Sequence, residues 1–179
     1  QSGAAGFAID GLRGDAEALP FRGASFDRVM ANHMLYHVPD QRAALQELKR
    51  VLKPGGRVVL ATNGADNFAR FGELHATAAT RLGYAAIGSD ALRFTLDDLP
   101  LMRSVFASAD VFAREDALLF PDAPSALRYY ASYHIDSIEE RAADGSHHAP
   151  LLREIGAAIE EIITREGVFR VPKSAGCFV

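Results

Sequence analysis

Between Asp40 and Thr62 the chain carries a helical pattern, a turn and a short apolar strand in direct succession. Apolar side chains first recur at helical spacing, at Ala44, Leu45, Leu48, Val51 and Leu52. Lys53-Pro54-Gly55-Gly56 then ends the helix, because proline disfavours helical backbone in the preceding residue and glycine permits a tight turn. The Val58–Ala61 run is continuously apolar, as in parallel strands covered on both faces. With a strand at residues 27–32 before it, this unit predicts an α/β fold.

The same rules predict the remaining elements. Strands are expected at residues 7–13, 27–32, 57–62, 111–120 and 169–179. Helices are expected at about 40–52, 68–82, 95–106, 125–133 and 151–165, with Asp40 capping the first of them. The chain shows no internal repeat, so we expect one domain over residues 1–179, with helical insertions at 64–106 and 121–150.

Composition limits the possible partners. The 179 residues are 49% hydrophobic and 23% charged, which is typical of a globular domain. The net charge of −4 gives no basic field for nucleic acid or an anionic membrane, and no apolar stretch approaches a membrane span. The single cysteine, Cys177, cannot form an internal disulfide and is expected in the core. We expect a cytoplasmic protein without a nucleic-acid or membrane partner; its oligomeric state is open.

The segment from Gly14 to Gly64 resembles the class I S-adenosylmethionine-dependent methyltransferases, in the branch of the ubiquinone and menaquinone biosynthesis enzymes. The resemblance rests on Gly14-Asp15-Ala16-Glu17-Ala18-Leu19-Pro20-Phe21, on Ser25-Phe26-Asp27 and on Glu47-Leu48-Lys49-Arg50-Val51-Leu52-Lys53-Pro54-Gly55-Gly56, in this order. It implies a Rossmann-like mixed sheet whose terminal strand runs antiparallel. We expect that strand beside residues 111–120 and next to residues 57–62.

The resemblance also implies a cofactor site. The Asp15 carboxylate would accept a hydrogen bond from the adenine amino group, and the N–H of Ala16 would meet a ring nitrogen, a pairing that reads one donor beside one acceptor. Gly14 and Glu17 flank them. Asn32, His33 and Met34 follow the strand at residues 27–32, where ligands of such sheets bind.

Two histidines are candidate catalytic residues. An imidazole pKa near 6.5 suits a general base at neutral pH, so His33 or His37 could deprotonate an acceptor. His37 could equally hydrogen-bond a loop carbonyl or cap the following helix. The expected activity is methyl transfer from S-adenosylmethionine to a small molecule, releasing S-adenosylhomocysteine, with helices at about 66–82 and 125–141 as a lid.

Part of the family pattern is missing. Its first strand, glycine-rich loop and ribose-binding acid should precede Gly3, so we expect an N-terminally incomplete domain that could be inactive alone and that exposes apolar sheet faces. Asp10 is too close to Asp15 to be the ribose acid. The alternative function is a non-catalytic remnant or interaction module. A dehydrogenase is disfavoured because no Gly-x-Gly-x-x-Gly occurs.

Further histidines and tyrosines have simpler interpretations. His147-His148 suggests a polar loop, and no metal site is predicted, because no third ligand stands at a usual spacing. Tyr129, Tyr130, Tyr133 and His134 could line a substrate pocket or form a half-buried helix face.

Overall fold

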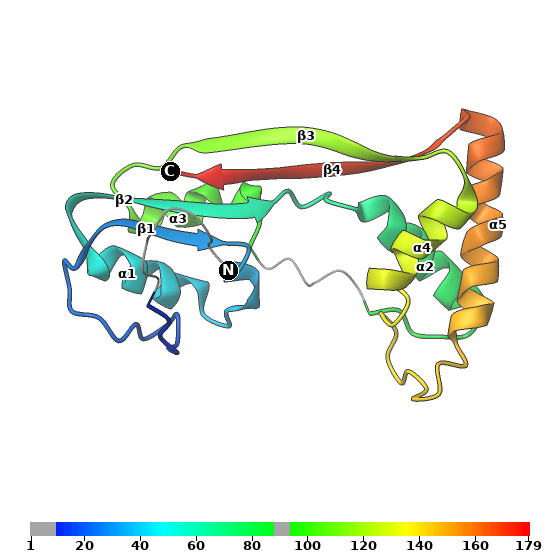
Figure 1. Cartoon of the computed structure of the whole chain (residues 1–179), viewed down its shortest axis with the longest axis horizontal. Helices are drawn as coiled ribbons and strands as arrows, with labels where there is room; N and C mark the ends of the chain where they lie inside the picture. The colour runs from blue at the N-terminus through cyan, green and yellow to red at the C-terminus, as the bar shows by residue number, and fades with distance from the viewer. Residues whose placement is uncertain (1–9, 88–93) are drawn as a thin grey trace.

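The computed structural model describes residues 10–87 and 94–179. Its sheet contains β1 (Phe26–Asn32), β2 (Leu52–Asn63), β3 (Val111–Phe120) and β4 (Phe169–Phe178), in the order β1-β2-β4-β3. β1 and β2 are parallel, whereas β4 runs antiparallel to both β2 and β3. The Rossmann-like mixed sheet and its antiparallel terminal strand, between the two predicted neighbours, are therefore confirmed (Figure 1).

The βαβ unit forms around helix α1 (Gln41–Val51). The Asp40 side chain accepts a hydrogen bond from the N–H of Ala43 at 2.9 Å, which confirms the predicted cap. The strand after it begins earlier than predicted. Leu52 already pairs with Phe26, and the extra residues up to Arg57, which pairs with Arg28, form an irregularity with Gly55 at φ 75°. A bulge thus accommodates the proline and glycines within the strand.

Two strand predictions need correction. Of the expected strand at residues 7–13, residues 7–9 lie outside the described residues, and residues 10–13 adopt no regular structure. The Val58–Ala61 run is not covered on both faces by the described residues. Val58 and Leu60 are buried, whereas Val59 and Ala61 are only half-buried, because the described helices that pack on β2 all lie on the other face.

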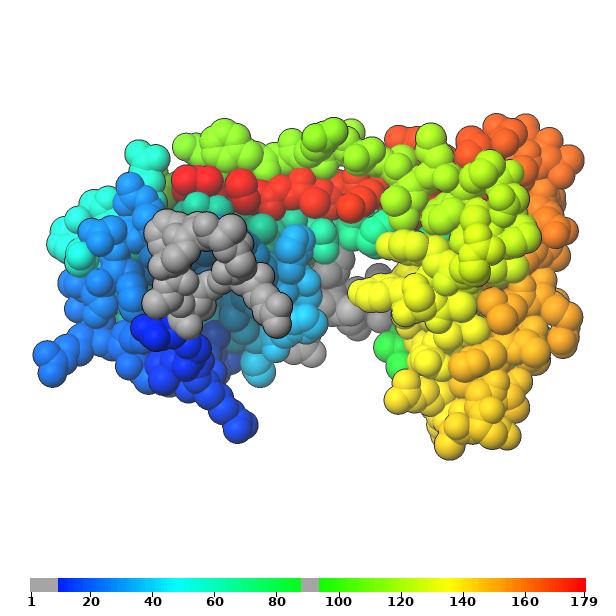
Figure 2. Space-filling view, in the orientation of Figure 1, coloured from blue at the N-terminus to red at the C-terminus, as the bar shows by residue number. Residues whose placement is uncertain are grey.

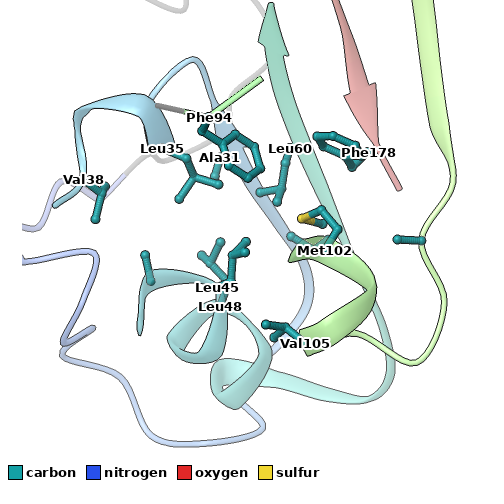
Figure 3. Packing of buried hydrophobic residues seen from close by; sticks show 13 residues of the cluster. Ala31, Leu35, Val38, Leu45, Leu48, Leu60, Phe94, Met102, Val105 and Phe178 are labelled. Atoms are coloured by element: carbon teal, nitrogen blue, oxygen red, sulfur yellow. The ribbon is translucent and has the colours of Figure 1, made fainter. Parts of the chain in front are cut away.

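One body of the molecule, here called the sheet body, is the sheet with α1 and α3 (Leu99–Val105). Both helices pack on one sheet face, where Leu45, Met102, Leu60 and Phe178 are fully buried (Figure 3). A short 3-10 helix, η2 (Leu96–Asp98), leads into α3. Thr95 caps it, accepting from the Asp97 N–H at 3.2 Å, so the predicted helix start is confirmed.

The other part, the helical body, comprises α2 (Ala69–Arg81), α4 (Ala123–Tyr133) and α5 (His148–Glu166). These helices enclose a separate apolar core that includes Phe169 and Val171 of β4. The helical body lies beyond the arrowheads of β1 and β2, and the long β3–β4 ribbon joins it to the sheet body (Figure 1). The parallel strands therefore end facing the space between the two bodies, which the space-filling view shows as a hollow (Figure 2).

The aromatic side chains of α4 face in different directions. Tyr130 is fully buried in the core of the helical body, whereas Tyr133 is 70% exposed. Tyr129 packs partly against Phe71 and Phe120. These contacts fit a half-buried amphipathic face. Cys177, expected in the core, is only half-buried, because it lies on the less covered face of β4.

Candidate functional site

The loop at residues 14–21 approaches the sheet body as a tight, irregular turn. The N–H of Ala18 donates to the Asp15 carbonyl at 3.2 Å, and the N–H of Glu17 donates to Oδ1 of Asp15 at 2.9 Å. The second bond is an Asx turn, in which the side chain closes its own backbone. It leaves Oδ2 of Asp15 without a hydrogen bond to any residue in 10–87 or 94–179.

Side chains of helix α1 hold this loop in position. Oε2 of Glu47 accepts the N–H of Leu19 at 2.8 Å, and the Arg50 guanidinium donates to the carbonyls of Leu19 and Phe21 at 3.0 and 2.8 Å. Arg50 also binds both Glu47 oxygens, at 2.6 and 2.7 Å, and this contact lowers the pKa of the Glu47 carboxyl. The loop position is thus set by an ionised side-chain pair.

A second contact joins the loop to the start of α1. Oε1 of Glu17 accepts the N–H of Asp40 at 2.8 Å. The Glu17 carboxylate therefore holds the loop against the segment that precedes α1.

The chain turns sharply where β1 ends. His33 follows Asn32 with φ 51°, an unusual angle for a residue with a side chain, and its N–H donates to the Ala61 carbonyl at 2.9 Å. The short helix η1 (Leu35–His37) then begins, and the N–H of His37 donates to the Met34 carbonyl at 3.0 Å. Strain of this kind persists where surrounding contacts hold it, and it is common at functional sites.

These two segments form the walls of one open cavity of about 740 Å³. It is lined by Arg13, Gly14, Asp15, Ala16, Met34, His37, Val38 and Pro39. Five of the eight residues that the sequence singles out thus line the same space, although Asp15 and His37 come from different segments. The side chains of Glu17, Asn32 and His33 do not line this cavity.

A neighbouring hollow of about 390 Å³ runs along the exposed side of β1. Asn32 and Met34 line it together with apolar side chains such as Leu19, Phe21 and Val29. Met30, on the same strand, is 67% exposed. β1 is the edge strand of the described sheet, so the expected exposed apolar surface is present here.

The cavity has the polar groups that an adenine edge requires. The N–H of Ala16 donates to no acceptor within the described residues, and Oδ2 of Asp15 is likewise unengaged there. One unpaired donor beside one unpaired acceptor complements the adenine amino group and its adjacent ring nitrogen. Met34, Val38 and Pro39 supply apolar walls. The residues present therefore fit the adenine portion of S-adenosylmethionine.

Sequence reasoning missed the residues that hold this site. The sequence identifies the Glu47 to Gly56 segment only as a family motif and as the end of a helix, whereas in the structure Glu47 and Arg50 position the loop that carries Asp15. Their i, i+3 spacing is a signal for mutual pairing. Nothing in the spacing identifies Leu19 and Phe21 as partners, because those contacts depend on the tertiary fold.

Comparisons with known proteins agree with this geometry. Residues 1–60 match a family model described as a methyltransferase domain. The demethylmenaquinone methyltransferase of Renibacterium salmoninarum is 29% identical over 137 residues, covering 76% of this chain and 52% of the relative. The enzyme of that name from Lactococcus lactis is 53% identical over 51 residues, covering 28% of this chain and 20% of the relative. The chain thus spans about half, or less, of the curated relatives it matches.

Solved structures support the fold. A candidate methyltransferase of Bacillus halodurans C-125 superposes with a TM-score of 0.55 at 15% identity, covering 95% of this chain and 76% of that one. A candidate methyltransferase from an antibiotic biosynthesis pathway of Anabaena variabilis gives 0.54 at 19% identity, covering 94% and 72%. With the sheet order, the cavity and the sequence relatives, these likenesses lead to one assignment. The findings support a class I S-adenosylmethionine-dependent methyltransferase of the ubiquinone and menaquinone type, which is the family that this chain resembles.

Proposed function

We propose that the protein transfers the methyl group of S-adenosylmethionine to a small-molecule acceptor. The observation that carries the proposal is the shared cavity, which Asp15 and Ala16 line together with Met34 and His37. Oδ2 of Asp15 would accept from the adenine amino group, and the N–H of Ala16 would donate to the adjacent ring nitrogen. Asn32, Met34 and the backbone at His33 would contact the same cofactor from the end of β1.

When bound, the cofactor supplies a methyl group that its sulfonium has already activated. The protein must therefore mainly orient the acceptor and exclude water. His37 is the better placed of the two candidate bases, because it is a lining residue of the cavity and His33 is not. Tyr36 packs against the His37 ring at 4.5 Å and the His33 ring at 6.5 Å, between centroids. An imidazole nitrogen of His37 would take the proton of the acceptor. His33 would orient the acceptor, or would act as the general base in place of His37.

We further propose that the helical body acts as the lid, with α2 and α4 facing the acceptor. Its place beyond the carboxyl ends of β1 and β2 supports this role, since ligands of such sheets bind at that edge (Figure 1). The relatives are named for demethylmenaquinone, but the match covers at most 52% of their length, so the acceptor is proposed only as a small molecule.

Calorimetric titration of S-adenosylhomocysteine into the full natural protein tests the cofactor site. We expect Asp15→Ala to weaken binding by about 1 to 3 kcal/mol, roughly 5- to 150-fold, because it removes a charged acceptor. Asp10→Ala is the matched control, since this exposed carboxylate lies five residues away and outside the cavity. Unchanged affinity in Asp15→Ala would refute the assignment.

The same titration distinguishes the proposed enzyme from the alternative function, a non-catalytic interaction module. A non-catalytic interaction module would bind no S-adenosylhomocysteine and would form none from S-adenosylmethionine with a panel of phenols, amines and quinols. The two relatives described above are both named methyltransferases, which favours the enzyme.

A further inference from the structure

Two adjacent histidines at the start of α5 converge on one carboxylate. Nε2 of His147 lies 2.9 Å from Oδ1 of Asp136, and Nε2 of His148 lies 2.8 Å from the same oxygen. One ligand atom from each residue lies within 4.8 Å of the other two. The third ligand that the sequence spacing did not identify therefore comes from the connection between α4 and α5, 11 residues before His147.

The two rings are arranged so that both nitrogens face a common point. Their centroids are 4.4 Å apart and their planes are nearly perpendicular, at 77°. Ligand atoms around a tetrahedral Zn²⁺ are roughly 3.3 Å apart when each bond is about 2.0 Å. The observed separations are about half an ångström shorter. The Asp136 side chain is 49% exposed, so a small rotation of its carboxylate would open the space for an ion.

Burial differs across the cluster. The His147 side chain is 2% exposed, whereas those of His148 and Asp136 are 42% and 49% exposed. One ligand is thus held rigidly by packing, and the other two form a face open to solvent. Such a face lets an ion enter and leaves room for a water molecule as a fourth ligand.

The ligand chemistry selects the class of ion. Two neutral imidazoles and one carboxylate carry a net charge of −1. A divalent cation bound to them would leave a net charge of only +1. Imidazole suits Zn²⁺ and neighbouring transition metals, whereas Mg²⁺ and Ca²⁺ prefer oxygen ligands. We propose that Asp136, His147 and His148 form a binding site for a divalent transition-metal ion of the Zn²⁺ class.

The position of the site indicates a structural role. Asp136 lies between Ile135 and Ile138, both buried in the core of the helical body, and His147 and His148 begin α5. An ion would therefore join the α4–α5 connection to the first turn of α5. The cluster belongs to the helical body, whereas the proposed cofactor cavity belongs to the sheet body, so the two sites are separate.

Metal titration of the full natural protein, stripped with a chelator, tests the proposal. Co²⁺ is the spectroscopic probe, because imidazole and carboxylate ligands at low coordination number give visible absorption, and Zn²⁺ is the calorimetric probe. We expect one equivalent of each per chain, with Zn²⁺ displacing Co²⁺ and excess Mg²⁺ displacing neither. Zn²⁺ should also raise the thermal midpoint.

Two ligand variants and one matched control complete the design. Asp136→Asn and His148→Ala should each weaken Zn²⁺ binding at least about tenfold, since losing even an outer partner of a metal ligand commonly costs that much. Both side chains are substantially exposed, so the fold should tolerate the changes. Asp144→Asn is the control, because this carboxylate lies in the same connection and caps the N–H of Ser146 at 3.0 Å outside the cluster.

Two results would overturn the proposal. No saturable binding of Co²⁺ or Zn²⁺ would mean that the three side chains form only a hydrogen-bonded cluster. Equal affinity in the wild type, Asp136→Asn and His148→Ala would place the ion on other residues. Circular dichroism of each variant identifies any loss of fold, and S-adenosylhomocysteine binding reports separately on the sheet body.

Discussion

The Glu47 carboxylate accepts the N–H of Leu19 at 2.8 Å and so joins residues 28 positions apart in the sequence. Leu19 belongs to the loop that carries Asp15, and Glu47 lies at the middle of α1. The side chain of Glu47 is 19% exposed, so water competes little for this contact. The cofactor-side loop is thereby anchored to the core of the sheet body, which links its position to the stability of α1.

Replacing Glu47 should therefore affect ligand binding from a distance. In Glu47→Ala the N–H of Leu19 and the Arg50 guanidinium lose the charged oxygen atoms to which they donate. Part of that loss should appear as weaker S-adenosylhomocysteine binding, about fivefold, in calorimetry of the full natural protein.

Glu47→Gln and Gln46→Ala are the controls for this effect. Glutamine keeps an oxygen that can accept from Leu19, so it should restore most of the affinity. Gln46 is exposed on the same helix and should be replaceable without effect. Equal affinity in Glu47→Ala and the wild type would mean that the loop keeps its position without this anchor.

Stability should fall in mild acid because of His134. Burial, with a smaller contribution from nearby His75, lowers the pKa of His134 to about 4, against about 6.5 in an unfolded chain. The unfolded state then binds more protons between these values. The stabilisation is fully present above pH 6.5 and is lost as the pH falls toward 4. Burial also lowers the pKa of His75, which adds to the same trend.

Urea unfolding at pH 7.5, 6.5, 5.5 and 4.5 measures this dependence. His134→Phe should make the unfolding free energy less sensitive to pH, since phenylalanine can keep the stacking on Tyr130 and Phe71 without a titrating group. Tyr133→Phe, at the exposed neighbouring position, should keep the wild-type dependence. An equally steep loss of stability in His134→Phe would assign the acid sensitivity to other groups.

Sequence patterns predicted those elements whose signals are local. The signals at Asp40, at Gly55 and in the apolar spacing of α1 lie within a few residues of the structure that they determine. The structure contains the predicted helix cap at Asp40 and a turn-like backbone at Gly55. The terminal strand was also placed correctly, but through the family resemblance rather than through its own pattern. Local chemistry and family likeness thus accounted for most of the sheet.

The contacts that build the site were less predictable from the sequence. Periodicity identifies the apolar face of α1 but not the pairing of Glu47 with Leu19, because that pairing depends on how the chain folds back. In the same way, His147 and His148 suggested only a loop until the fold brought Asp136 to them. The sequence also predicted His33 and His37 as equivalent candidate bases. Of the two, only His37 lines the cavity, because the chain turns sharply at His33.

A glycine in β4 keeps the long ribbon between the two bodies intact. Gly176 pairs with Thr62 on one side and Ala113 on the other. A Cβ at Gly176 would collide with the Phe112 carbonyl oxygen and lie 2.9 Å from the Cα of Ala113, and backbone cannot move aside as a flexible side chain can. Gly176→Ala should therefore separate β3 from β4.

We expect Gly176→Ala to lower the free energy of unfolding by about 1 to 3 kcal/mol, the usual cost of overpacking. Gly72→Ala is the opposite case, because a Cβ there meets nothing within 4 Å and the residue lies inside α2. Alanine favours helix over glycine, so this variant should gain up to about 1 kcal/mol. Urea unfolding of both variants measures these changes in the free energy of unfolding. Equal stability of Gly176→Ala and the wild type would mean that β3 and β4 can pair without the close approach at this glycine.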